Sequence, residues 1–208
     1  MKIDSAALKA ECVNNPKNYS ATVDSVTMTL PQWFAGGFDQ VCADILNVVD
    51  AAFFVYRTSV PIAELQNAVN WANYTPLDAI PLSAANGLTY SETLLLWQTR
   101  AIKAQGMQMN LQNIILGAQG VLNAANPGVR SGLTDAMTSL PTGASGAPLS
   151  GGWGTVRDTV LARAATRAEK LFASKTVQQD GTSAAKAATL TFEGLLSSDD
   201  VKAARMLP

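Results

Sequence analysis

Histidine is absent from this sequence, which removes the commonest general base and the commonest metal ligand of proteins. Charged residues are also scarce, because Asp, Glu, Lys and Arg make up only 15% of the chain, against ~25% in typical soluble domains. The 15 basic residues almost balance the 16 acidic ones. No nucleic acid or anionic membrane is therefore indicated as an electrostatic partner.

Cysteine is nearly absent as well, since Cys12 and Cys42 are the only two. Two cysteines cannot build the dense disulfide framework of a small secreted domain. We expect both to be ordinary core residues, because free cysteine is among the most buried residue types. A single bridge between them is the alternative, and the sequence leaves both open.

Long apolar runs are missing too. No uninterrupted run approaches the ~20 residues that a transmembrane helix needs, so we expect no membrane span. The first residues, Met1 to Asp4, have no apolar core of the kind that a signal peptide needs. We therefore expect the chain to be made in a cytoplasm-like compartment and to stay there until it is assembled.

The common catalytic motifs are not found. The sequence has no glycine-rich phosphate loop followed by lysine, no G-x-G-x-x-G after a strand and no G-x-S-x-G turn. Helix capping and a solvated face explain the carboxylates Glu169, Asp199 and Asp200. We predict a protein that is not an enzyme and uses no cofactor or metal. An enzyme with a site of carboxylates only would need two of them facing a cleft.

Hydrophobic residues, at 48% of the chain, combine with this low charge to leave a surface rich in small uncharged residues. Such a surface suits packing against other subunits, whereas solitary soluble proteins usually carry more charge. The composition therefore favours a protein that functions as a subunit of an assembly.

Apolar residues recur at helical spacing along most of the chain, which predicts a mainly α fold. The predicted helices span 5–13, 39–56, 60–71, 90–105, 110–122, 129–140, 155–173 and 198–205. An extended strand is expected around 23–30, and two short β-favouring runs within 176–193 predict a hairpin. The expected fold class is a compact multi-helix bundle with a small β-hairpin near the C-terminus.

The one low-complexity segment predicts the domain organisation. Residues 141–152 are rich in Gly, Ser and Pro, a composition typical of flexible linkers. We expect a helical body over 1–140, the linker, and a C-terminal helix, hairpin and helix over 153–208 that pack on the body.

Exposed aromatic residues and the hairpin are the candidate contacts with a partner. An aromatic pair in a Gly-rich loop, Trp33 and Phe34, either fastens that loop to the core or contacts a neighbouring subunit. The hairpin is expected to reach beyond the body. The candidate interface residues are Trp33, Phe34, Trp153, Thr176, Val177, Leu190 and Phe192.

Both ends of the chain carry motifs of a known group. The first are Leu8-Lys9-Ala10-Glu11, Asn15-Pro16, Tyr19 and the segment from Asp39 to Asn47; the last are Arg167-Ala168-Glu169-Lys170-Leu171-Phe172, Ser198-Asp199-Asp200-Val201 and Ala204. In these motifs the chain resembles small helical proteins encoded among the structural genes of tailed bacteriophages. It departs from them at Asn15, where aspartate is usual, in an insertion between Tyr19 and Asp39, and in the loop 178–188.

The resemblance implies a non-enzymatic component of the virion, made in the bacterial host cytoplasm. It would lie in the tail, neck or fibre-attachment region, in multiple copies of a symmetric assembly, and bind other virion proteins. The alternative is a cytoplasmic helical adaptor or assembly chaperone that acts during morphogenesis and then leaves.

Overall fold

A computed structural model describes residues 3–74, 80–84, 87–141 and 150–208 of the chain. The chain divides into two compact units. Unit 1 comprises Met1–Tyr56 and Arg163–Pro208, and unit 2 comprises Arg57–Ala162. The linker expected at 141–152 lies mostly outside the described residues.

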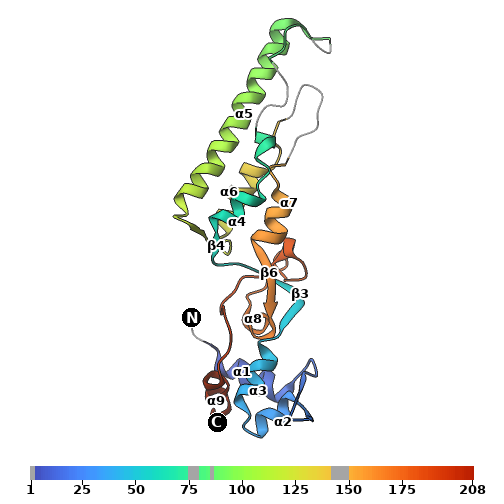
Figure 1. Ribbon diagram of the computed structural model, residues 1–208, viewed down its shortest axis with the longest axis vertical. Coiled ribbons are helices and arrows are strands. Elements are labelled where there is room, and N and C mark those ends of the chain that lie inside the picture. The colour runs from blue at the N-terminus through green and yellow to red at the C-terminus, as the bar shows by residue number, and fades with distance from the viewer. Residues whose placement is uncertain (1–2, 75–79, 85–86, 142–149) are drawn as a thin grey trace. The chain divides into compact units, whose positions relative to one another are not determined.

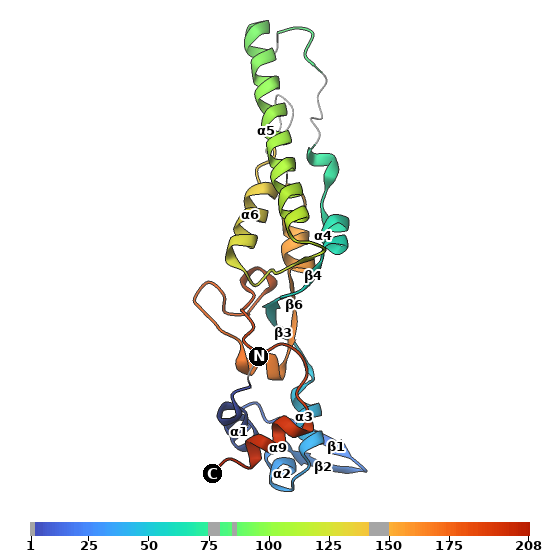
Figure 2. The same cartoon turned by 90° about the vertical axis from the view of Figure 1, so that its left-hand side faces the viewer.

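Four helices surround the main core of unit 1, as Figure 2 shows. They are α1 (Ser5–Asn14), α2 (Leu30–Ala35), α3 (Asp39–Leu46) and α9 (Ser198–Arg205). Asp4 caps the first helix and Ser197 caps the last, where Asp199 and Asp200 occupy the first turn as predicted. The core side chains that these helices bury include Leu8, Cys12, Trp33, Phe34, Leu46 and Val201.

A hairpin does occur in unit 1, but near its N-terminal end. Strand β1 (Ser20–Val23) pairs antiparallel with β2 (Val26–Thr29). The two residues between the strands, Asp24 and Ser25, have φ angles of 49° and 67°. Positive φ at both central residues is typical of the two-residue turns that match the twist of paired strands.

The predicted helix over 39–56 is wrong in its second half. After α3 the side chain of Asn47 exchanges two hydrogen bonds with the backbone of Leu196, at 2.9 and 2.8 Å. The chain then continues as strand β3 (Val49–Tyr56). Because β-branched and aromatic residues favour strands, this Val- and Phe-containing segment suits the extended form.

The predicted helix over 155–173 is wrong as well. This stretch contains a short helix α7 (Trp153–Thr155), a π-helical turn η2 (Val156–Val160), strand β6 (Ala162–Thr166) and helix α8 (Arg167–Phe172). Strand β6 pairs with β3. Helix α8 starts anew because Thr166 and Glu169 form a capping box.

The hairpin expected at 176–193 is also corrected. A single antiparallel bridge joins Ser174 to Thr189, and a short 3-10 helix η3 (Ala184–Lys186) lies between them. The segment lies along β3 instead of projecting, since Ala188 exchanges hydrogen bonds with Phe54 and Tyr56 at 2.9 Å each. Ala188 and Leu190 of this segment form a second small core with Phe53, Val55 and Ala165.

Unit 2 is organised around one long helix, α5 (Tyr90–Gly117), the 28-residue helix labelled in Figure 1. Thr89 caps it, and the predicted capping box with Glu92 is confirmed. The helix was expected to end at Gly106 but continues past it, because a glycine inside a helix costs only ~1 kcal/mol, which tertiary packing overrides.

Shorter elements pack beside the C-terminal half of α5. They are β4 (Val60–Pro61), α4 (Ile62–Ala68), the 3-10 helix η1 (Trp71–Tyr74), β5 (Val121–Leu122) and α6 (Pro127–Met137). Figure 2 shows α6 and α4 beside this half of α5. Strands β4 and β5 pair antiparallel. This pairing joins the segment before α4 to the segment after α5.

The expected fold class, a compact multi-helix bundle with a C-terminal hairpin, is therefore wrong. Helices predominate, but two-stranded sheets interrupt them in both units. The physical reason is the pairing of β3 with β6, which draws two segments of helix-like periodicity into a sheet. Within the described residues, no helix is both long enough and apolar enough to cross a bilayer.

Candidate functional site

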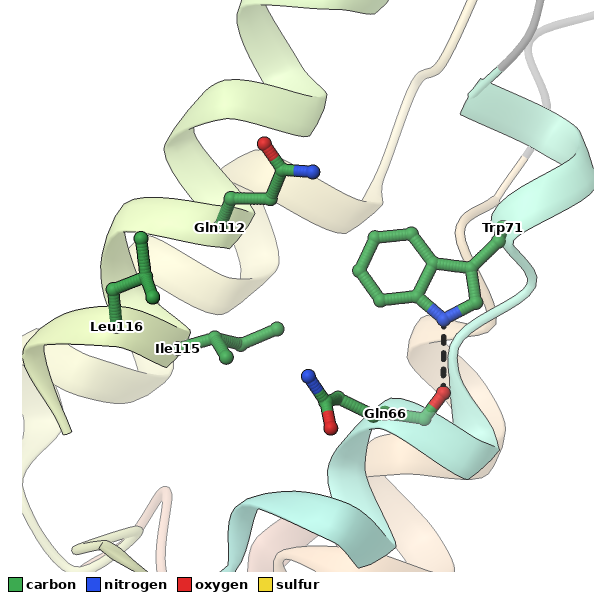
Figure 3. Close-up of a pocket in the computed structure, with 5 residues that line it drawn as sticks. All are labelled: Gln66, Trp71, Gln112, Ile115 and Leu116. Carbon is green, nitrogen blue, oxygen red and sulfur yellow. Dashed lines mark hydrogen bonds between the residues drawn. The ribbon is translucent and has the colours of Figure 1, made fainter. Parts of the chain in front are cut away.

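The candidate site of unit 2 is a cleft between α5 on one side and α4 with η1 on the other. It has a volume of about 440 Å³ and is lined by Gln66, Trp71, Gln112, Ile115 and Leu116. Figure 3 shows Ile115 pointing from α5 toward the indole of Trp71, with the two glutamine amides at the edge. The cleft thus pairs an apolar floor with a neutral polar rim.

The wall that carries Trp71 is held in place by hydrogen bonds. The indole Nε1–H donates to the backbone oxygen of Gln66 at 3.0 Å. The ring of Tyr74 lies next to it, with ring centroids 5.9 Å apart. Tyr74 is buried, and its hydroxyl donates to the backbone oxygen of Ala136 at 2.9 Å, while burial raises its pKa to about 12. The aromatic wall is therefore tied to α6 through a neutral phenol.

A second groove follows the other side of α5, where the helix faces β5 and α6. Its volume is about 400 Å³. Helices α5 and α6 come close here because Gly132 has no side chain. A Cβ at this position would lie only 3.2 Å from Cδ1 of Ile114. The lining residues are Asn113, Ile114, Gly117, Ala118, Val121, Leu122, Asn123, Asn126, Gly128, Val129 and Gly132.

Neither cleft carries a charged side chain among the described residues that line it. Apolar and amide groups recognise uncharged surfaces of another protein, whereas an ionic substrate would need a fixed counter-charge. The chemistry of the two clefts therefore suits an apolar segment of a partner protein.

Unit 1 contains a smaller, charged pocket beside β3 and α8. There the guanidinium of Arg167 lies 4.1 Å from the ring centroid of Tyr19, and Lys170 pairs with Asp50 at 2.5 Å. The hydrogen bond from Lys170 holds the pKa of Asp50 below its usual value. Arg167 also donates to the backbone oxygen of Ile45 at 3.0 Å. These cations thus already have partners within the unit.

The two cysteines are free and buried, so the expected role as core residues is confirmed and the bridge is not formed. Burial raises the pKa of both thiols to about 12. No group of three or more Cys, Asp or Glu in the part of the chain that the structure describes could hold a metal ion. Thiol chemistry at neutral pH is therefore suppressed in both side chains.

The predicted interface residues are mostly buried: Trp33, Phe34 and Phe192 share the main core of unit 1, and Leu190 lies in its second core. Trp153 is half-buried in unit 2. The two that lie on the surface are Thr176 and Val177.

The clefts beside α5 were not predicted from the sequence. Most of their lining residues fall in predicted helices, while Asn123, Asn126 and Gly128 fall between two of them. Nothing in the local pattern separates a buried side chain from one that faces a cleft. The pairing of Trp71 with Gln112 and Ile115 depends on how η1 meets α5, which is a tertiary property.

Comparison of the chain with protein-family models, with curated proteins and with solved structures found no match. The resemblance to tailed-phage structural proteins therefore stays a prediction that rests on the motifs at the two ends.

Proposed function

We propose that this chain is a structural component of a tailed-phage particle, in the tail, neck or fibre-attachment region. It binds other virion proteins through the two clefts that flank α5. The single observation that carries the proposal is the uncharged lining of both clefts, one of which presents Trp71.

The composition of the clefts agrees with what protein interfaces use. Interface cores are depleted of charged residues and enriched in aromatic ones, and a few aromatic anchors supply most of the binding energy. Trp71 is held rigidly by its bond to Gln66, so little conformational entropy is lost when a partner covers it. The low overall charge supports the same role.

The second candidate is a helical adaptor or assembly chaperone. Open apolar clefts could hold the segment of a client until that client is assembled. The two functions differ in where the chain resides after morphogenesis, since a virion component stays and a chaperone leaves.

An infection time course separates the two. Particles are purified on a density gradient, and an antibody against the chain is used on the particle and soluble fractions. We expect the chain in mature particles. Its presence in assembly intermediates but not in mature particles would support the chaperone and overturn the proposal.

A charge placed in the cleft tests the binding surface itself. Gln66 is exposed, so Gln66→Glu leaves the fold intact and puts a carboxylate at the rim. We expect reduced incorporation into particles, because an unpaired charge in an interface must be desolvated. Gln178→Glu, at an exposed glutamine of unit 1, is the matched control and should incorporate normally.

A further inference from the structure

The outward face of α5 carries large apolar side chains at a constant interval of seven residues. Leu95, Ile102, Met109 and Leu116 are exposed to 63%, 69%, 59% and 75%. These four residues, called the outer stripe below, extend over most of a helix that is ~42 Å long at 1.5 Å per residue. Single exposed apolar residues are normal, but a regular row of four is not explained by the fold of one chain.

The inward face of α5 already supplies the contacts that unit 2 needs. Its buried side chains lie on a different side of the helix from the outer stripe and include Thr93, Ala104, Leu111 and Ile115. The outer stripe is therefore not required to complete the core of its own unit.

A seven-residue interval indicates what kind of surface covers the stripe. Residues seven apart drift only ~20° around an α-helix, so a slight supercoil keeps them facing one partner helix along its whole length. In a two-helix contact each heptad places two positions, three and four residues apart, against the partner helix. The outer stripe fills one of these positions with apolar side chains, and Gln98, Gln105 and Gln112, three residues further along, fill the other. A flat sheet or a loop would impose no such interval.

The positions beside the stripe narrow the choice of partner. Gln98, Gln105 and Gln112 repeat at the same interval and lie exposed along one flank. Neutral amides both donate and accept hydrogen bonds, so an identical row can face them without repulsion. A highly charged partner helix would find no counter-charges in either row.

We propose that a second copy of this chain covers the outer stripe, with the α5 helices of the two copies packed along each other. The other helices that the structure describes are no longer than the 11 residues of α6, so α5 is the one with the length and the repeat. The stripe ends at Leu116, which also lines the cleft beside Trp71, so a second copy on the stripe reaches one edge of that cleft. The proposal deepens the structural role proposed above, on which it rests for its biological setting, by naming one of the partners.

The contact is tested on the full purified chain by sedimentation equilibrium. The wild type should be a dimer or a higher oligomer. Ile102→Lys with Met109→Lys should weaken association on the order of 100-fold or more, since like charges across an interface are strongly unfavourable. The glutamate pair, Ile102→Glu with Met109→Glu, should do the same.

Mixing the two charged variants gives the decisive reading. The lysine and glutamate variants are each expected to be monomeric alone and to associate when mixed, because opposite charges then meet across the stripe. The matched control is Leu195→Lys with Met206→Lys, at residues of unit 1 exposed to 70% and 72%, which should associate like the wild type. Circular dichroism confirms that each variant is folded.

A wild type that stays monomeric at its solubility limit would overturn the proposal. So would charged variants that associate as tightly as the wild type, or a mixture that does not associate. Because no particle is involved, such a result removes the α5 contact and leaves the virion role standing. Conversely, absence of the chain from particles would leave a measured dimer untouched.

Discussion

The carboxylate of Glu169 is buried and held by Arg163 through two hydrogen bonds of 2.8 and 2.6 Å. Its oxygens also accept the backbone N–H groups of Thr166 at 2.9 Å and Gly194 at 3.1 Å. Desolvation raises the pKa of this carboxyl, but these donors together outweigh it and hold the pKa below its usual value. Glu169 thus joins β6, the start of α8 and the loop before α9 at one point.

Replacing this carboxylate should destabilise unit 1. We expect Glu169→Gln to lower the free energy of unfolding by about 2 kcal/mol or more, because Arg163 then faces an amide and loses its buried counter-charge. Urea denaturation followed by circular dichroism measures the change. Glu64→Gln is the control, since Glu64 is exposed and a solvent-exposed ion pair contributes little to stability. Equal effects of the two would contradict the role assigned to Glu169.

Acid should weaken unit 1 through three carboxyls with lowered pKa values. Arg205 holds the pKa of Asp39 below its usual value by hydrogen bonding, as Lys170 does for Asp50. A carboxyl with a lowered folded-state pKa stabilises the fold above its unfolded pKa, and that stability is lost as the pH falls through the folded value. The loss should begin below the ordinary values of 4.5 for Glu169 and 3.8 for the two aspartates.

This pH dependence is measured as the midpoint of urea unfolding at a series of pH values from about 6 to about 3. The series covers the pH range in which ordinary carboxyl groups titrate. The midpoint should be flat near neutrality and fall in acid. The urea midpoint of Asp50→Asn should fall less steeply with decreasing pH, because one carboxyl group that binds a proton on unfolding is removed. An unchanged slope in that variant would show that Asp50 does not contribute.

The thiols of Cys12 and Cys42 should be unreactive in the folded chain. With pKa values of about 12 raised by burial, almost no thiolate forms at pH 8 and reagents cannot reach the sulfur. Iodoacetamide should label neither residue until urea unfolds the protein, after which both should react. Fast labelling under native conditions would contradict the burial of Cys12 and Cys42 in the core of unit 1.

Two glycines of unit 2 should respond oppositely to alanine. A Cβ at Gly106 would meet nothing within 4 Å, so Gly106→Ala should stabilise α5 by about 0.5–1 kcal/mol. A Cβ at Gly151 would lie 2.3 Å from the hydroxyl oxygen of Tyr74, so Gly151→Ala should cost about 1–3 kcal/mol. Thermal unfolding of the two variants checks both signs, and changes of the same sign would contradict the arrangement.

Helix ends were predictable where a side chain caps its own backbone. The capping box of Thr89 with Glu92 and the cap at Ser197 are local, because donor and acceptor lie three residues apart. The same pattern, Thr166 with Glu169, is present in the sequence, but the apolar periodicity over 155–173 runs across it and favours one long helix. This capping box marks the start of α8 and excludes a single helix over 155–173.

The strands were not predictable in the same way. Residues 49–56 have apolar side chains at helical spacing, yet they form β3 because β6 and the segment around Ala188 supply hydrogen bonds from distant parts of the chain. Such pairing is invisible to local periodicity.

The outer stripe of α5 shows an intermediate case. The interval from Leu95 to Leu116 can be counted in the sequence. The sequence pattern divides this interval between two predicted helices, because Gly106 is typical of a helix end. Which of the two faces is buried became clear only from the packing of α4, η1 and α6 against α5.

The central proposal is that several copies of this chain are built into a phage particle. Quantitative mass spectrometry of purified mature particles, with isotope-labelled peptides of the chain as standards, measures this most directly. We expect a fixed number of copies greater than one per particle, the same in independent preparations. Particles that contain no peptide of the chain, while the soluble fraction of the same lysate does, would contradict the proposal.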